Sequence, residues 1–248
     1  MSHIEAIKGL RTQLEAKENT NIQMPEYFNF GFDVIDEIAN KRDKTAYIEV
    51  DASGTIITEH SFSDLRDRSN QMANLLKQHG VKKGDFAVVL LPRIGAWYET
   101  MIGCIKSGVV AMPGTNLLTA RDIEFRINHA KATAVIVSEE HVGKIAEIKS
   151  HCPSLKHFFV VGCKLDDWVS LDEELPNASK SLTQSDADAS RSDDTMLAYF
   201  TSGTTANPKL VARNHGYALA HYITGAYWLN LKPDDIHWTL SDLSLIHI

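Results

Sequence analysis

The sequence predicts an α/β fold in which a mainly parallel β-sheet is flanked by helices. Between residues 86 and 162, short apolar runs of strand length alternate with single amphipathic helices. This alternation is typical of βαβ units, in which consecutive strands run parallel. The chain has 248 residues, which is enough to bury a sizeable hydrophobic core around such a sheet.

The first part of the chain predicts two helices and one pair of strands. Apolar residues at helical spacing predict a short helix over residues 4–17 and a second helix within residues 25–41. Residues 45–62 then alternate in the manner of two strands, with a turn at residues 51–54 between them.

A longer helix is predicted to begin directly after these strands. Ser61 is followed three residues later by Asp64, which resembles a capping box, and Gly80 is a stop signal. Four apolar residues of this segment share one helical face, and we expect them in the core: Leu65, Met72, Leu75 and Leu76.

The regular part of the chain follows. Strands are expected over residues 86–91, 109–114, 133–138 and 156–162, and helices over residues 96–108, 119–130 and 139–152. Gly108 marks the end of the first of these helices, and Thr119 is suited to cap the start of the second.

A polar stretch interrupts this pattern at residues 175–194, which contain few large apolar residues. We interpret it as a linker or a long surface loop. Beyond it we expect strands at 195–200 and 210–213 and a helix over 215–230. The expected organisation is therefore a first α/β lobe at 25–174, the polar linker or loop at 175–194, and the start of a second lobe at 195–248.

Composition and charge narrow the functional classes. The net charge of −7 argues against a general nucleic-acid-binding protein, which would carry a basic surface. The three cysteines form no CxxC pair and suggest a reducing compartment. The N-terminus lacks the apolar core of a signal peptide, and no apolar run has the length of a membrane span. We therefore expect a cytoplasmic, soluble protein, whose oligomeric state the sequence leaves open.

The stretch richest in groups that could bind a ligand is TSGTTANPK, at residues 201–209, directly after an expected strand. Backbone N–H groups in a tight turn can hold an anion, hydroxyls add hydrogen-bond donors, and a lysine adds a positive charge. The residues of this kind are Thr201, Ser202, Gly203, Thr204, Thr205 and Lys209.

The loop is not a P-loop of the type GxxxxGK[ST]. Gly203 and Lys209 have the right separation, but Pro208 stands where glycine is needed and Leu210 where a magnesium-binding hydroxyl is needed. On residue types alone, a phosphate-binding loop and an ordinary polar turn both remain open.

A resemblance favours the first of these. The loop resembles the phosphate-binding signature [ST]-[ST]-G-[ST]-T-G-x-P-K of the adenylate-forming acyl-CoA synthetase superfamily, from which it departs at Ala206, where that family usually has glycine. Residues 84–130 and 215–242 also look like the corresponding regions of medium-chain acyl-CoA synthetases, so that the resemblance covers nearly all of residues 25–242.

The resemblance implies an ATP-dependent acid–thiol ligase. Enzymes of this family activate a carboxylic acid as its acyl-adenylate and then transfer the acyl group to CoA. The implied substrates and cofactors are a medium-chain fatty or aromatic acid, ATP, Mg²⁺ and CoA, without nucleic acid. The six loop residues named above would contact the phosphate groups, with Lys209 as the electrostatic contact.

Other candidate residues carry weaker signals. The histidines and cysteines at residues 151–163 fit no zinc pattern, so no metal site is expected. His215 is close in sequence to the loop and is a candidate neighbour of it. Arg126 is expected to form a structural ion pair. The aromatic residues of 217–228 suit either an acyl pocket or a helix core.

The family's enzymes are longer than this chain. The resemblance implies that a Tyr-Gly-x-Thr-Glu-like segment, a ribose-binding Asp and a C-terminal domain with a catalytic Lys are missing. We therefore expect an incomplete N-terminal AMP-binding domain that is inactive alone and holds no catalytic residue. The alternatives are another adenylate-forming enzyme, such as an aryl-acid ligase or a peptide-synthetase adenylation module, and a non-catalytic nucleotide-binding or interaction fragment.

Overall fold

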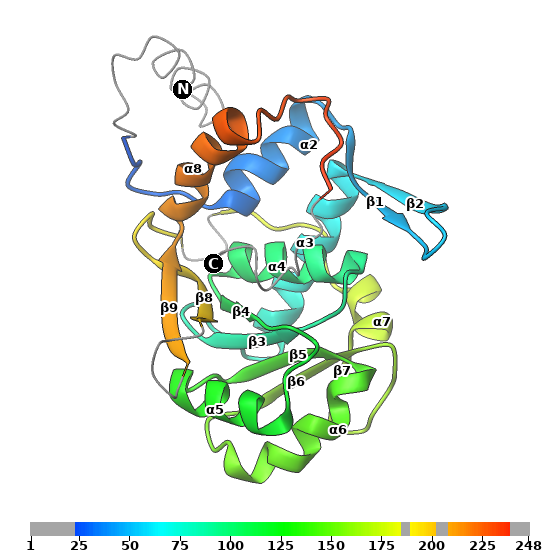
Figure 1. The fold of residues 1–248 in the computed structure, drawn as a ribbon, viewed down its shortest axis with the longest axis vertical. Helices are drawn as coiled ribbons and strands as arrows, with labels where there is room; N and C mark the ends of the chain where they lie inside the picture. The colour runs from blue at the N-terminus through cyan, green and yellow to red at the C-terminus, as the bar shows by residue number, and fades with distance from the viewer. Residues whose placement is uncertain (1–22, 185–188, 202–207, 239–248) are drawn as a thin grey trace.

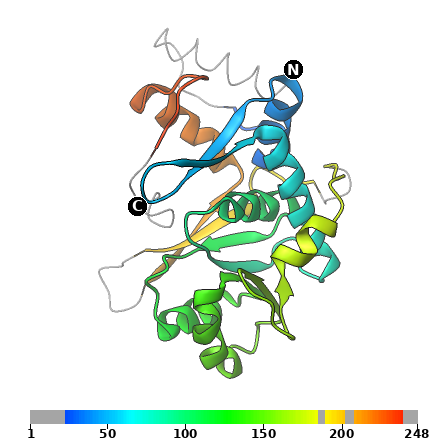
Figure 2. The ribbon, with the colours of Figure 1, turned by 90° about the vertical axis from the view of Figure 1, so that its right-hand side faces the viewer.

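The computed structural model describes residues 23–184, 189–201 and 208–238 of the chain. Its centre is a seven-stranded sheet with helices on both faces, and a separate two-stranded sheet stands apart from it (Figure 1). Figure 2 shows this strand pair, β1 and β2, on the far side of helix α4 from the large sheet. The helix predicted over residues 4–17 lies outside the described residues.

The strands of the large sheet are ordered β7-β6-β5-β3-β4-β8-β9. The strands are β1 Thr45–Val50, β2 Ile56–Ser61, β3 Phe86–Leu90, β4 Val110–Pro113, β5 Ala134–Ser138, β6 His157–Val161, β7 Val169–Ser170, β8 Thr195–Thr201 and β9 Lys209–Asn214. Every neighbouring pair in the large sheet is parallel except β8 and β9. The predicted mainly parallel α/β fold is therefore confirmed.

The helices connect these strands as the sequence predicts. They are α2 Glu37–Lys41, α3 Phe62–Gln78, α4 Gly95–Ser107, α5 Ala120–Ala130, α6 Glu139–Ile148, α7 Leu171–Glu174 and α8 Gly216–Ile223. Shorter helical turns are η1 Gly31–Asp36, η2 Lys149–His151, η3 Leu175–Asn177 and η4 Thr224–Trp228. The short elements β7 and α7 were not predicted, because their apolar residues are too few to show a period.

Each face of the sheet has its own apolar core. Ala87 and Val89 of β3 pack with residues of α3 and α4 on one face. Val88 and Leu90 pack with residues of α5 and α6 on the other. This division follows from the alternation of side chains along a strand, which sends neighbouring residues to opposite faces. Because both faces are covered, the central strands are apolar throughout.

The local signals for helix ends are confirmed. Ser61 and Thr119 each accept a hydrogen bond from the backbone three residues later, and Asp64 and Asp122 accept one in return, so that both helices start with a capping box. Gly108 ends α4 with a φ of 71°, a left-handed conformation that glycine adopts without steric cost.

The polar segment 175–194 is fastened to helix α3 over much of its described length. The side-chain amide of Gln71 donates to the carbonyls of Pro176 and Ala178, and that of Asn70 donates to the carbonyl of Lys180. The segment therefore follows the surface of the first lobe, and β8 then joins β4 in the same sheet. The sheet is continuous across the predicted division into two lobes, and that division stays a prediction.

The chain near residue 25 and the residues just before β8 form a junction. Phe28 donates its backbone N–H to the carbonyl of Ser190, and Ser192 donates its own to the carbonyl of Glu26. The buried amide of Asn29 donates to the carbonyl of Ile105 at the end of α4 and to the hydroxyl of Ser190. These bonds fix the start of β8 relative to α4.

Candidate functional site

The predicted phosphate loop connects the two strands of the β8–β9 hairpin. Thr201 and Lys209 are paired across the antiparallel ladder, at the end of the hairpin that the loop connects, which we call the loop end. Thr201 is partly buried and Lys209 is exposed. Ser202, Gly203, Thr204 and Thr205 lie outside the described residues, as does Ala206. The structure therefore brings together the two described members of the predicted site.

The loop end of the hairpin lies at the carboxyl edge of the sheet. Strand β8 runs parallel to β4, and β4 runs parallel to β3, so the three strands end at the same edge. In α/β sheets, ligands bind in the crevice outside this edge, because the loops that leave the strands gather there. Thr201 and Lys209 therefore lie at the edge where such loops gather, and their contact with phosphate stays a prediction.

Strand alternation assigns the two residues to one face of the hairpin. Tyr199 belongs to the core on the α3 and α4 side, whereas Phe200 and its ladder partner Leu210 pack on the α5 and α6 side. Thr201 and Lys209 therefore share the face of Tyr199. Burial raises the pKa of the Tyr199 hydroxyl on this face.

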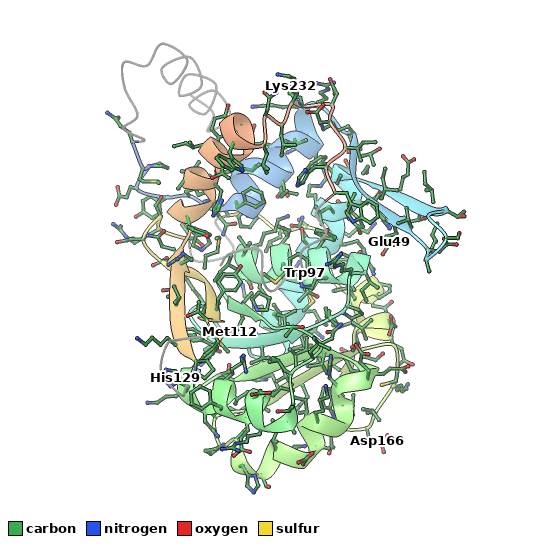
Figure 3. All side chains as sticks on the ribbon, viewed as in Figure 1. Glu49, Trp97, Met112, His129, Asp166 and Lys232 are labelled. Atoms are coloured by element: carbon green, nitrogen blue, oxygen red, sulfur yellow. The ribbon has the colours of Figure 1, made fainter. Side chains whose placement is uncertain are left out.

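The N-terminus of α4 lies at the same edge but already holds a carboxylate. Glu49, which β1 carries, accepts a hydrogen bond from the backbone N–H of Gly95, the first residue of α4. His60 lies 3.2 Å from the other oxygen of this carboxylate, through its Nε2 atom. Figure 3 shows Glu49 on the β1–β2 pair and Trp97 on α4. A carboxylate at a helix N-terminus interacts favourably with the helix dipole.

His215 lies at the opposite end of the hairpin from the predicted loop. It follows Asn214, which pairs with Thr195 at the start of β8, whereas Thr201 pairs with Lys209 at the other end. Thr195 and Thr201 are six residues apart along β8, which separates these ends by roughly 20 Å. Proximity in sequence therefore does not make His215 a neighbour of Thr201 or Lys209. Its side chain is buried at the junction with Ser192 and Asp194.

Lowering the pH from about 6.5 toward 4 is expected to destabilise the protein through His215. Burial lowers the pKa of His215 to about 4, an effect that the positive charge of Lys83 increases and that Asp194 opposes. The unfolded chain takes up this proton at about pH 6.5. Between the two values the unfolded state binds more protons than the folded state. The free energy of unfolding therefore decreases as the pH is lowered, by up to about 3 kcal/mol.

Urea unfolding at several pH values between 7 and 4 would measure this effect. The variant His215→Gln should show a flatter dependence on pH than the unaltered protein. His151→Gln is the matched control, because the side chain of His151 is exposed. Parallel curves for the unaltered protein and His215→Gln would contradict the assignment.

Among the described residues, no group of three or more His, Cys, Asp or Glu side chains is arranged to hold a metal ion. Over that same part of the chain, no helix combines the length and the apolar character needed to cross a membrane. The two described members of the candidate site, Thr201 and Lys209, carry a hydroxyl group and an amino group, and groups of this kind can bind an anion.

A comparison with sequence models of protein families identifies the family of this chain. A sequence model of the family described as AMP-binding enzyme matches residues 35–248. The chain belongs to the AMP-binding enzyme family. The resemblance seen in residues 201–209 is thereby confirmed at the level of the family, and the individual contacts of the six loop residues stay predictions.

Among the curated relatives of this AMP-binding enzyme chain are acyl-coenzyme A synthetases. The mitochondrial synthetase ACSM4 of Mus musculus is 35% identical over 241 residues, which cover 94% of this chain and 41% of the relative. The mitochondrial synthetase ACSM3 of Mus musculus is 33% identical over 235 residues, which cover 91% of this chain and 40% of the relative. The chain therefore spans about two fifths of the length of these relatives.

Solved structures show the same fold. An acyl-CoA synthetase of Brucella canis superposes with a TM-score of 0.76 at 23% identity, covering 96% of this chain and 42% of that one. The anthranilate CoA ligase AuaEII, solved with anthranoyl-AMP, gives a TM-score of 0.72 at 24% identity, covering 82% and 38%. These two likenesses show that the chain shares its fold with the matching parts of both structures.

Proposed function

We propose that this chain supplies the phosphate-binding part of an ATP-dependent acyl-CoA ligase. The observation that carries the proposal is the β8–β9 hairpin, which pairs Thr201 with Lys209 at the carboxyl edge of the sheet in a member of the AMP-binding enzyme family. The curated relatives, which are named as acyl-coenzyme A synthetases, support the reaction class.

The proposed reaction has two steps. A carboxylate oxygen of the acid attacks the α-phosphorus of ATP, which forms an acyl-adenylate and releases pyrophosphate. The thiol of CoA then attacks the acyl carbon, and AMP leaves with the electron pair of the broken bond. Activation is needed because a free carboxylate is a poor acyl donor, whereas AMP is a competent leaving group.

The role proposed for the hairpin is to hold the β- and γ-phosphates during the first step. Negative charge grows on the departing pyrophosphate, and a fixed ammonium group with hydroxyl and N–H donors stabilises that charge. Lys209 is the first residue of β9 and is exposed. Magnesium is proposed to arrive with the nucleotide, as the magnesium complex of ATP.

The proposed acid is a medium-chain fatty acid, with aromatic acids as the second class. This choice rests on the likeness of residues 84–130 and 215–242 to medium-chain synthetases. It is a proposal about the whole ligase, because the chain spans about 41% of the relatives' length.

Replacing Lys209 with methionine is expected to weaken the binding of inorganic pyrophosphate about tenfold, because one charge-assisted contact is lost. Isothermal titration calorimetry of the 248-residue chain would measure the affinity. Lys232→Met is the matched control, since Lys232 is exposed and Figure 3 labels it at the far end of the molecule from α5. Equal affinities for Lys209→Met and the unaltered chain would refute the role of Lys209.

The cytoplasmic location predicted from the sequence stays a proposal. The curated relatives are named as mitochondrial proteins. Fractionation of cells that contain the tagged protein would distinguish the two compartments.

A further inference from the structure

The loop end of the β8–β9 hairpin extends beyond β4, the strand that β8 pairs with in the sheet. Strand β4 ends at Pro113, and its pairing with β8 is through Ala111 and Leu197. Phe200 and Thr201 follow Leu197 by three and four residues, and their ladder partners Leu210 and Lys209 belong to β9, the edge strand. Because β4 does not extend alongside this end, its position depends on the side chains that pack against it.

Three side chains of helix α5 supply that packing by converging on the ring of Phe200. The guanidinium carbon of Arg126 lies 5.3 Å from the ring centroid. The rings of Phe125 and His129 meet the Phe200 ring edge-on, at centroid distances of 5.9 and 5.7 Å. Figure 3 labels His129 at the end of α5 that lies beside the hairpin. We call these four residues the α5 cluster.

Besides the ring of Phe200, the guanidinium group of Arg126 contacts a backbone group of its own helix. Its guanidinium donates to the backbone carbonyl of Asp122, at 3.0 Å. No carboxylate of the described residues forms an ion pair with it, so the structural ion pair expected from the sequence is replaced by a ring contact. Partial burial lowers the pKa of Arg126, which Asp122 opposes. A half-buried guanidinium over an aromatic face gains more from that contact than an exposed one.

We propose that Arg126 is a positioning residue for phosphate binding by the hairpin. Through Phe200 it fixes the last residues of β8, so that Thr201 and its partner Lys209 are held in the geometry that an anion needs. The inference rests on the proposed function, because it assigns Arg126 a part in the same site. The gain is preorganisation: a hairpin end that is already ordered loses less conformational entropy when phosphate binds.

Arg126 lies on the face of the hairpin opposite to Thr201 and Lys209, which argues against a direct contact between Arg126 and the phosphate. Phe200 and Leu210 turn toward α5, whereas Thr201 and Lys209 turn toward the opposite face of the hairpin. Arg126 therefore acts through the Phe200 ring. A lysine at this position would keep the charge but would lose the planar stacking on the ring.

The test compares Arg126→Met, Arg126→Lys and the unaltered 248-residue chain. Arg121→Met is the matched control, because Arg121 is an exposed residue of the same helix. The first measurement is the affinity for inorganic pyrophosphate by titration calorimetry. The second is amide hydrogen exchange over residues 198–201 and 209–212, which needs no ligand.

We expect Arg126→Met to bind pyrophosphate five- to tenfold more weakly and to exchange these amides at least fivefold faster. Its melting temperature should stay within a few degrees of that of Arg121→Met, and Arg126→Lys should recover only part of the affinity. Unchanged affinity in Arg126→Met would overturn the inference. Full recovery by lysine, with unchanged amide exchange in Arg126→Met, would also overturn it, because that pattern indicates direct charge contact.

The two measurements also separate this inference from the proposed function. If the unaltered chain does not bind pyrophosphate, the phosphate-binding role of the hairpin fails. Amide exchange then still decides whether Arg126 positions the hairpin end: faster exchange in Arg126→Met supports it, and unchanged exchange overturns it.

Discussion

Replacing Lys106 with methionine is expected to lower the free energy of unfolding by about 3–5 kcal/mol, because it leaves an unpaired carboxylate inside the protein. The side chain of Lys106 is fully buried, and its ammonium group lies 2.6 Å from Asp36 Oδ1. It lies equally close to Asn70 Oδ1. Burial lowers the pKa of Lys106 and raises that of Asp36, and the pairing opposes both shifts.

Urea unfolding of Lys106→Met would measure this loss, with Lys41→Met as the matched control. Lys41 pairs with Glu37 on the surface, and its removal should cost less than about 1 kcal/mol. The double variant Lys106→Met/Asp36→Leu should regain much of the loss, since no buried charge remains. Equal stabilities of Lys106→Met and Lys41→Met would contradict the account.

Replacing Gly103 with alanine is expected to destabilise the protein by about 3 kcal/mol, in the upper part of the usual range for overpacking. Gly103 lies in α4, where α3 comes close. An added Cβ would lie 2.6 Å from the Cβ of Met72 and 3.1 Å from the backbone carbonyl oxygen of Ser69. Neither atom belongs to a flexible chain end, so the two helices would have to separate.

Gly143→Ala is the control for this prediction. Gly143 lies in α6, and an added Cβ would meet no atom within 4 Å. Alanine is the better helix former, so this variant should gain up to about 1 kcal/mol. Thermal unfolding of both variants should therefore give shifts of opposite sign. A stabilised Gly103→Ala would mean that α3 and α4 do not pack this closely.

The elements themselves were largely predictable from the sequence. The strands at 86–91 and 133–138 and the capping boxes at Ser61 and Thr119 were expected and are present. These signals are local, because apolar periodicity and capping depend on residues within a few positions of one another. The short β7 and α7 gave no such signal.

The candidate site was predictable as a motif and only partly as geometry. The signature at residues 201–209 indicated the family, which the family comparison confirms. The sequence could not show that His215 lies at the far end of the hairpin, because a strand that folds back separates residues that are close in number.

The sequence by itself determined the order of strands and helices along this chain and the family to which it belongs. Only the tertiary structure decided that β9 runs antiparallel at the sheet edge, that Lys106 meets Asp36, and that Arg126 lies on the ring of Phe200. The last two pairs are separated by 70 or more residues. Periodicity tells which face of an element is buried, but the packing partner is selected by shape and charge when the whole domain folds.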